Sequence, residues 1–401
     1  MPQAQFRGVW YADHSAPRAH SDSWLAGRFR KAGFVFVGKT NTPELGILPT
    51  TEPVAYGASR NPWDTSRSTG GSSGGSGAAV ASGMVAIGHA NDGGGSIRIP
   101  ASCNGLVGLK ATRGRVSMAP LGDFASGLGT ELVVSRSVRD TAAILDAVHG
   151  AAPGDPYVAP PPGRPYVEEL DADPGPLRIG LIVRSFTEDP VHPEAASAAR
   201  DAARLLESMG HAVEERSGEE IEGLDLVDTF LTRWMAGQAA TLAELQQVVG
   251  REIHADDVEP LTWALAEEGR RRSAGEYLLA VGRHQLITRI VAGWFESGLD
   301  LLLTPTTGES PPPLGTFDDS GEDPLGAIHR ARITAGFTAL LNATGHPAIS
   351  LPLHWSPEGL PIGVQLVAPY GREDVLIRVA AQLERARPWS ERVPETSATV
   401  T

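Results

Sequence analysis

The chain has 401 residues, of which 41% are hydrophobic and 20% are charged, so it can bury a large core and disorder is excluded as its main state. A net charge of −14 argues against a broad nucleic-acid-binding face, and a single cysteine, Cys103, excludes an intramolecular disulfide. No apolar run approaches the ~18 residues of a membrane span, and the first residues lack a signal peptide's apolar stretch. We therefore expect a cytoplasmic protein.

The first part of the chain alternates short regular segments with glycine-rich loops. Residues 23–31 have a helical pattern that stops before Gly33, and the β-branched run 34–38 predicts a buried strand. Residues 57–77 are rich in Gly and Ser, whereas residues 78–86 are small and apolar, which predicts a tightly packed helix. Because that helix follows at once, a flexible linker explains residues 57–77 poorly.

The middle of the chain has a strand–helix–strand rhythm. Residues 177–183 predict a strand, residues 193–209 a helix with Pro near its start and Gly just past its end, and Ala212 begins another strand. Residues 225–297 are helical in pattern. Further strands are predicted at 106–110, 300–303, 348–353 and 363–367, and further helices at 137–149 and 374–383. We expect an α/β fold with a mixed, largely parallel central sheet covered by helices on both faces.

Two glycine-rich clusters carry the strongest functional signal. Residues 70–74, G-G-S-S-G, match the G-x-S-x-G string of a nucleophile elbow, but the segment before them is polar instead of a buried strand. A phosphate-binding loop would need a lysine that is absent here. The eleven histidines are scattered without a metal-binding motif. An α/β-hydrolase elbow, a phosphate loop and a metal site are therefore the poorer explanations.

The second cluster, Gly93-Gly94-Gly95-Ser96, has a more specific physical meaning. Three successive glycines can turn consecutive N–H groups into one concavity, and a serine at its end would lie beside an oxyanion hole. Acyl transfer needs such a pair of nucleophile and donors. From spacing alone, a structural glycine turn before a strand is an equally good interpretation.

Several segments together resemble the amidase signature family. They are residues 38–46 (GKTNTPELG), 60–64 (RNPWD), 70–77 (GGSSGGSG), 92–100 (DGGGSIRIP), 105–110 (GLVGLK), 347–352 (PAISLP) and 360–365 (LPIGVQ). The resemblance extends from about residue 20 to residue 385. Within the family it is nearest to the 6-aminohexanoate-cyclic-dimer hydrolase branch, through residues 50–53 and 369–374, a match that does not define the natural substrate.

The resemblance implies a Ser–cis-Ser–Lys triad. Ser96 matches the nucleophile, and Ser72 matches the bridging serine, whose peptide bond is cis in the family. The N–H groups of Gly93, Gly94 and Gly95 would form the oxyanion hole. Residues expected to support the loops are Ser73, Asp92 and Arg98, with Ser76 bonding its own loop.

The resemblance also defines the expected partners. It implies a small-molecule amide substrate and no metal or organic cofactor, and we expect neither a nucleic acid nor a membrane as partner. Homo-oligomerisation is left open. Ile47 and Trp234 are candidates for the pocket wall, although core packing explains each of them better.

The triad lysine is the one departure from the family pattern. The family places it in a V-K-D-like string on a strand well before the nucleophile, whereas this chain has only Lys31, Lys39 and Lys110, none followed by aspartate. Lys39 and Lys110 lie inside segments already matched to other parts of the pattern. We therefore expect one amidase domain over residues 1–390 that lacks its N-terminal part, followed by a disordered tail over residues 391–401.

The sequence thus predicts an amidase that acts through an acyl-enzyme on Ser96. An inactive amidase-like relic or binding scaffold is a second interpretation, because a serine without a base is a poor nucleophile. A base supplied by Lys39 or Lys110 is a third. A relative of the amidase component of the tRNA-dependent amidotransferase is another alternative, although neither the helical region nor the acidic charge favours it.

Overall fold

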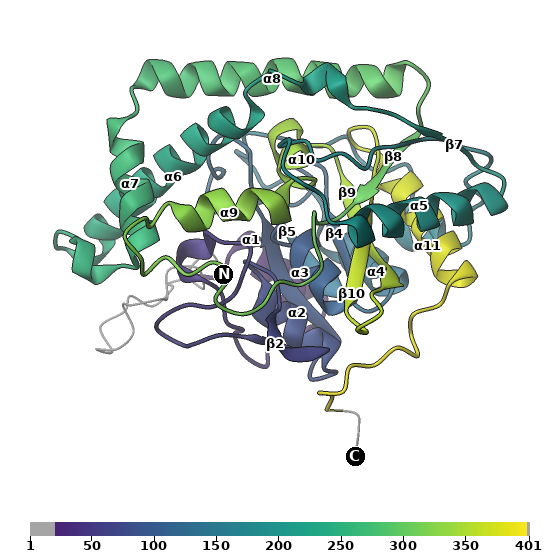
Figure 1. Cartoon of the computed structure of the whole chain (residues 1–401), viewed down its shortest axis with the longest axis horizontal. Helices are drawn as coiled ribbons and strands as arrows, with labels where there is room; N and C mark the ends of the chain where they lie inside the picture. The colour runs from purple at the N-terminus through teal and green to yellow at the C-terminus, as the bar shows by residue number, and fades with distance from the viewer. Residues whose placement is uncertain (1–20, 399–401) are drawn as a thin grey trace.

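The structure, a computed structural model, describes residues 21–398 and is built on an eight-stranded sheet with helices on both faces (Figure 1). In spatial order the strands are β3 (Ile87–Asp92), β5 (Thr130–Ser135), β4 (Val107–Lys110), β9 (Ala348–Trp355), β10 (Pro361–Val367), β8 (Leu301–Pro305), β6 (Arg178–Leu181) and β7 (Ala212–Glu215). A separate two-stranded sheet joins β1 (Arg60–Asn61) to β2 (Asp64–Ser68). The expected α/β class with a mixed sheet is confirmed.

The direction of the strands differs from the prediction. Only β6 pairs in parallel, with β7 and with β8, and the five other pairs among these eight strands are antiparallel. The expectation of a largely parallel sheet is therefore wrong. A strand–helix–strand crossover, which produces parallel neighbours, occurs at β6, α5 (Pro193–Ser208) and β7, whereas β9 and β10 form a hairpin around Gly359.

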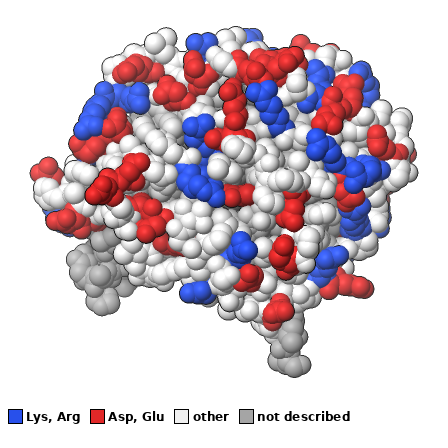
Figure 2. Space-filling model, in the orientation of Figure 1, with Lys and Arg blue, Asp and Glu red and all other residues white. Residues whose placement is uncertain are grey.

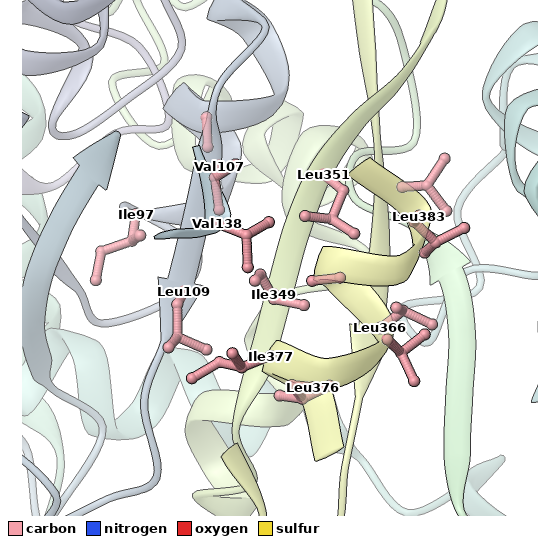
Figure 3. Close-up of a cluster of buried hydrophobic side chains, with 14 of the residues drawn as sticks. Ile97, Val107, Leu109, Val138, Ile349, Leu351, Leu366, Leu376, Ile377 and Leu383 are labelled. Carbon is pink, nitrogen blue, oxygen red and sulfur yellow. The ribbon is translucent and has the colours of Figure 1, made fainter. Parts of the chain in front are cut away.

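Both faces of the sheet are buried, and successive side chains of each strand point alternately to one face and to the other. On β9, Ile349 and Leu351 face α11 (Glu373–Ala386), whose Leu376, Ile377 and Leu383 lie over them (Figure 3). Ser350, between them, belongs to the opposite face, where α3 (Arg98–Asn104) packs. The helices α4 (Val138–Val148) and α2 (Gly74–Ala81) extend the two layers toward β5 and β3.

A second group of helices covers one end of the sheet and builds a roof over the strand ends (Figure 1). It comprises α6 (Leu226–Val249), α7 (Pro260–Arg271), α8 (Ala274–Glu296), α9 (Gly326–Ala335) and α10 (Ala339–Thr344). Within residues 21–398 no helix combines the length and apolarity that crossing a membrane requires. On the face shown in Figure 2, acidic and basic side chains are interspersed.

The run after α1 (Trp24–Lys31) contradicts the prediction of a buried strand at residues 34–38. Ser23 caps α1 as its pattern suggests, but the run that follows forms no strand, and Val35 and Val37 are 83% and 78% exposed. A strand needs a hydrogen-bonding neighbour, and among the described residues none pairs with this run or with the outer edge of β3. A β-branched pattern predicts an extended chain but cannot supply its partner.

The C-terminal segment also differs from its prediction. Residues 391–398 lie against the body of the protein, where the Ala398 N–H donates to the Ser82 carbonyl over 2.7 Å and the Thr396 N–H donates to the Pro62 carbonyl over 3.2 Å. The expected disorder is wrong for these residues, because backbone hydrogen bonds to a distant loop hold them despite their polar composition. Residues 399–401 lie outside the described part of the chain.

Candidate active site

A cavity of about 530 Å³ lies beneath the helical roof, beside the end of β3. Its floor includes Gly93 and Ser96, from the loop that joins β3 to α3. One wall comes from residues 121–131, which lead into β5, and the roof includes Trp234 and Gln238 of α6. Of the second glycine cluster of the sequence, Gly93 and Ser96 therefore lie on the surface of the cavity, whereas Gly94 and Gly95 do not line it.

The backbone of this loop is fixed so that its N–H groups are left without acceptors. The Thr338 hydroxyl donates to the Gly94 carbonyl over 2.6 Å, and the Ile99 N–H donates to the Gly95 carbonyl over 2.7 Å. Since the C=O and N–H of one trans peptide point in opposite directions, the N–H groups of Gly95 and Ser96 point away from these partners. Within residues 21–398 no N–H from Gly93 to Ser96 donates a hydrogen bond.

The three glycines are required by crowding. A Cβ atom at Gly93 would lie 3.0 Å from the Trp234 ring, and one at Gly94 would lie 3.2 Å from the Phe230 ring. At Gly95, where φ is +141°, a Cβ atom would lie 2.4 Å from the Thr338 hydroxyl. The loop backbone itself therefore forms this part of the cavity surface.

The two serines of the expected triad are both buried but are not bonded to each other. Ser96 is 8% exposed and lines the cavity, and its hydroxyl makes no hydrogen bond within residues 21–398. Ser72 follows a cis peptide bond from Gly71, as the resemblance implied, but it does not line the cavity. No hydrogen bond joins the two hydroxyls in this arrangement of the described residues.

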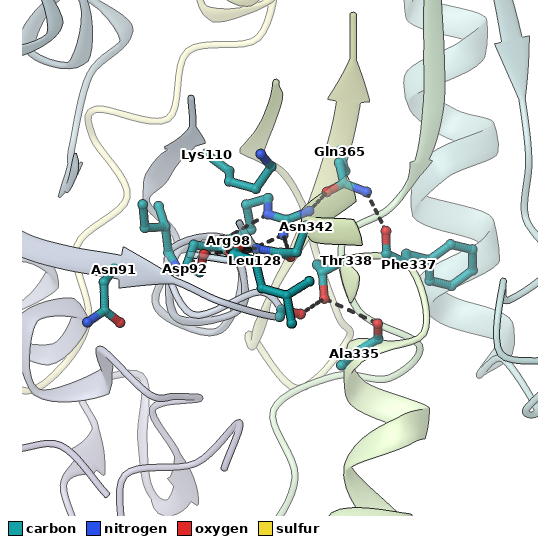
Figure 4. A network of polar contacts seen from close by, with 12 residues as sticks. Asn91, Asp92, Arg98, Lys110, Leu128, Ala335, Phe337, Thr338, Asn342 and Gln365 are labelled. Carbon is teal, nitrogen blue, oxygen red and sulfur yellow. Dashed lines mark hydrogen bonds and ion pairs between the residues drawn. The ribbon is translucent and has the colours of Figure 1, made fainter. Parts of the chain in front are cut away.

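A buried polar network lies directly under the loop (Figure 4). The Asp92 carboxylate accepts two hydrogen bonds of 2.9 Å from the Arg98 guanidinium, and it also accepts from the Ile97 N–H and from the Asn342 amide. Arg98 in turn donates to Gln365 over 2.8 Å and to Asn342 over 2.7 Å. Burial alone would raise the pKa of Asp92, but the charge of Arg98 and these hydrogen bonds lower it below its ordinary value.

Serines of the first glycine cluster attach α2 to β3. The Ser73 hydroxyl lies 3.3 Å from the Asn91 N–H and 3.4 Å from the Asn91 carbonyl. The Ser76 hydroxyl donates to the His89 carbonyl over 2.7 Å. The two glycine clusters, separated by residues 78–92 in the sequence, are thus adjacent in space.

None of the three lysines lines the cavity. Lys110 is completely buried on β4, where its ammonium donates to the Ala111 carbonyl over 2.9 Å. Desolvation, with the charge of Arg98 as the next cause, lowers its pKa to about 7. Lys31 and Lys39 are exposed. Within residues 21–398 no cluster of His, Cys, Asp and Glu is arranged to hold a metal ion.

Sequence reasoning missed part of the cavity wall. Asp123, Glu131, Gln238 and Glu244 line it, yet they come from two distant stretches that share no motif. Of the two pocket candidates, Trp234 does line the cavity, whereas Ile47 packs in a core cluster beside it. No pattern along the chain distinguishes these residues from ordinary surface or core positions.

A mixed α/β sheet with a serine-bearing cavity at its strand ends places this protein among the α/β enzymes. The amidase family model matches residues 11–377, and the chain belongs to this family, as its sequence resemblance indicated. It is therefore an enzyme of the amidase class.

Individual relatives agree with this assignment. The chain is 43% identical over 390 residues to 6-aminohexanoate-cyclic-dimer hydrolase of a Pseudomonas species (strain NK87), covering 95% of this chain and 79% of that protein. A solved structure of 6-aminohexanoate cyclic dimer hydrolase superposes with a TM-score of 0.92 at 42% identity, covering 96% of this chain and 81% of that one. A glutamyl-tRNA(Gln) amidotransferase structure from Thermotoga maritima superposes with a TM-score of 0.78 at 27% identity, covering 98% of this chain and 83% of that one.

Proposed function

We propose that this protein hydrolyses a carboxylic amide, linear or cyclic, through an acyl-enzyme formed on Ser96. The Ser96 oxygen attacks the amide carbonyl carbon, the C–N bond breaks, and the amine leaves with a proton. Water then cleaves the ester on Ser96 and releases the carboxylic acid. Ser72 relays the proton between Ser96, the leaving amine and a base. Similarity to cyclic-dimer hydrolases supports the cyclic alternative.

One observation carries this proposal: the Ser96 hydroxyl lies on the cavity surface next to a row of N–H groups that have no acceptor within the described residues. Buried N–H groups normally find an acceptor, so this row favours a ligand oxygen. The N–H groups of Gly93, Gly94 and Gly95, with that of Ser96, would stabilise the negative oxygen of the tetrahedral intermediate.

The network under the loop suits a supporting role in this mechanism. Asp92 and Arg98 hold the loop from below, and Ser73 ties α2 to the last residues of β3. Ser72 must move or rotate to reach Ser96, since no hydrogen bond joins them here. These roles are part of the proposal: Asp92, Arg98 and Ser73 act through the position of Ser96 rather than by touching the substrate, whereas Ser72 transfers the proton.

The proposed reaction also needs a proton acceptor. Lys110 does not reach the cavity, Lys31 and Lys39 are exposed, and we assign the role to none of them. We propose that a lysine in a V-K-D-like segment, the position that the family pattern implies, serves as this base. An inactive amide-binding protein is the alternative that this missing lysine favours.

The acyl-enzyme can be tested by trapping it. The chain, extended upstream with a V-K-D-like segment as the source of the base, is incubated with an activated ester such as p-nitrophenyl acetate and digested, and its acylated peptide is identified by mass spectrometry. We expect the acetyl group on Ser96, and its loss in Ser96→Ala but not in the matched control Ser76→Ala. An adduct on any other residue, with Ser96 unmodified, would contradict the proposal. Retained binding of an amide without any adduct would favour the inactive binding protein.

A further inference from the structure

The wall of the cavity is strongly one-sided in charge. Four carboxylate residues line it, and among all the described residues that line it there is no Lys, Arg or His. Asp92 is neutralised by Arg98, and Asp123 accepts from the Ser126 N–H in the field of Arg113 and Arg233, which leaves Glu131 and Glu244. A low-dielectric cavity lined by one sign of charge attracts a ligand of the opposite sign and repels one of the same sign.

Glu131 is the least compensated of these carboxylates. It is 4% exposed and faces Asn91 across the β3–β5 pair, next to the loop that bears Ser96. Its carboxylate accepts no hydrogen bond within residues 21–398, and the His89 Nε2 atom lies 4.0 Å away. That nitrogen also has no hydrogen-bond partner in the described part of the chain. A buried carboxylate without donors is costly, so its surroundings favour a cationic donor.

A second, independent observation comes from the roof. Gln238 of α6 is 1% exposed, lines the same cavity, and its Oε1 atom has no hydrogen-bond donor among residues 21–398. Glu244, one turn and a half further along α6, is exposed and makes no ion pair within the described chain. Both walls of the cavity therefore present acceptors that lack donors.

The remaining surface suits an alkyl chain next to a cation. Phe124 and Trp234 line the cavity with their ring centroids 5.2 Å apart and form an aromatic patch above Gly93, and Phe230, which does not line it, lies 5.6 Å from Trp234. Such a patch binds methylene groups by burial and attracts an ammonium group through its ring faces. The cavity thus combines an apolar lining with acceptors at its edges.

We propose that this cavity selects amides that carry a primary ammonium group on an alkyl chain, with the ammonium received by Glu131 and Gln238. The amide part of this inference rests on the function proposed above, whereas the selection of a cation rests only on the cavity wall. Burial raises the pKa of Glu131 to about 7, and a bound ammonium would hold that carboxylate in its charged form.

Binding measurements test the inference without catalysis. Three probes of equal length, hexylammonium, 1-hexanol and hexanoate, are titrated calorimetrically into the 401-residue chain at pH 8. We expect hexylammonium to bind at least ~10-fold more tightly than 1-hexanol, the gain typical of one charge-assisted hydrogen bond, and hexanoate to bind more weakly than 1-hexanol. Equal affinity for hexylammonium and 1-hexanol, or tighter binding of hexanoate, would overturn the inference.

Variants locate the site. Glu131→Gln should weaken the binding of hexylammonium by about 10-fold and change the affinity for 1-hexanol by less than about 2-fold. The exposed control Glu322→Gln should change neither affinity. Gln238→Met, a second variant on another element, should also weaken hexylammonium selectively. Unchanged hexylammonium binding in both variants would place the cation elsewhere and contradict the assignment. Ser96→Ala should keep the binding order, so failure of the acyl-enzyme and failure of cation selection remain distinguishable.

Discussion

The polar network under the cavity floor and the wall of the cavity are both buried, yet they differ in how their polar groups are satisfied. In the network, Asp92, Arg98, Asn342 and Gln365 form hydrogen bonds with one another, so that each charge and amide has partners. On the wall, the Glu131 carboxylate and the Gln238 Oε1 atom have none within the described chain. Buried polar groups with partners hold a structure, whereas buried groups without partners are available to a ligand.

The comparison extends to the loop between the two regions. The Gly94 and Gly95 carbonyl groups accept from Thr338 and Ile99, and the N–H groups from Gly93 to Ser96 donate no hydrogen bond within the described chain. The loop therefore resembles the network through the oxygens of Gly94 and Gly95 and the wall through its nitrogens.

The largest effect, on the rate of amide hydrolysis, should come from adding the lysine that serves as base for Ser96. A version of the protein extended upstream with a V-K-D-like segment should hydrolyse amides about 10²–10⁴-fold faster than the 401-residue chain, because a positioned base contributes about that much. Steady-state turnover on aliphatic, aromatic and cyclic amides measures the difference. Ser96→Ala in the extended version is the control and should abolish it. Equal rates for the short and extended forms would show that the base lies within these 401 residues.

Removing the ion pair between Arg98 and Asp92 should reduce the unfolding free energy. Arg98→Met leaves the Asp92 carboxylate buried without its cation, which typically costs about 3–5 kcal/mol of unfolding free energy. Urea denaturation monitored by circular dichroism would measure the loss. The matched control Arg30→Ala breaks an exposed pair with Asp22, in which Arg30 is 61% exposed, and should change stability by less than about 1 kcal/mol. Similar losses of unfolding free energy in both variants would mean that the buried network contributes no more to stability than an exposed ion pair.

A buried lysine of β4 should make stability depend on pH. The pKa of Lys110 is about 7 in the folded protein and 10.5 ordinarily, so between these values the unfolded chain binds a proton that the folded protein does not. The unfolding free energy of the wild type, relative to Lys110→Met, should therefore rise with pH from about 7 to about 10, by at most ~1.4 kcal/mol per pH unit. Denaturation at pH 6, 8 and 9.5 tests this slope. A pH-independent difference would mean that Lys110 keeps its ordinary pKa.

The same division explains what the sequence could predict. Local chemistry indicated individual elements: the helices predicted from residues 23, 137 and 193, and the three glycines before a serine, all appear where the pattern indicates. The strand directions, the missing neighbour of residues 34–38 and the positions of Glu131 and Gln238 depend on contacts between distant segments. A pattern of alternating or periodic residues contains no information about such partners.

The smallest effect concerns the wall, where a gain in stability is expected. The pKa of Glu131 is about 7 in the folded protein and 4.5 ordinarily, so the folded protein favours the protonated form. The contribution of Glu131 to the unfolding free energy is therefore complete below pH 4.5 and is lost as the pH rises through 7. Glu131→Gln should therefore stabilise the protein by about 1–2 kcal/mol at pH 8 and by little at pH 4.5, whereas Glu322→Gln should do neither. Urea denaturation at both pH values measures this. A loss of stability at pH 8 would show that the Glu131 carboxylate already has a partner, as the polar groups of the network under the loop do.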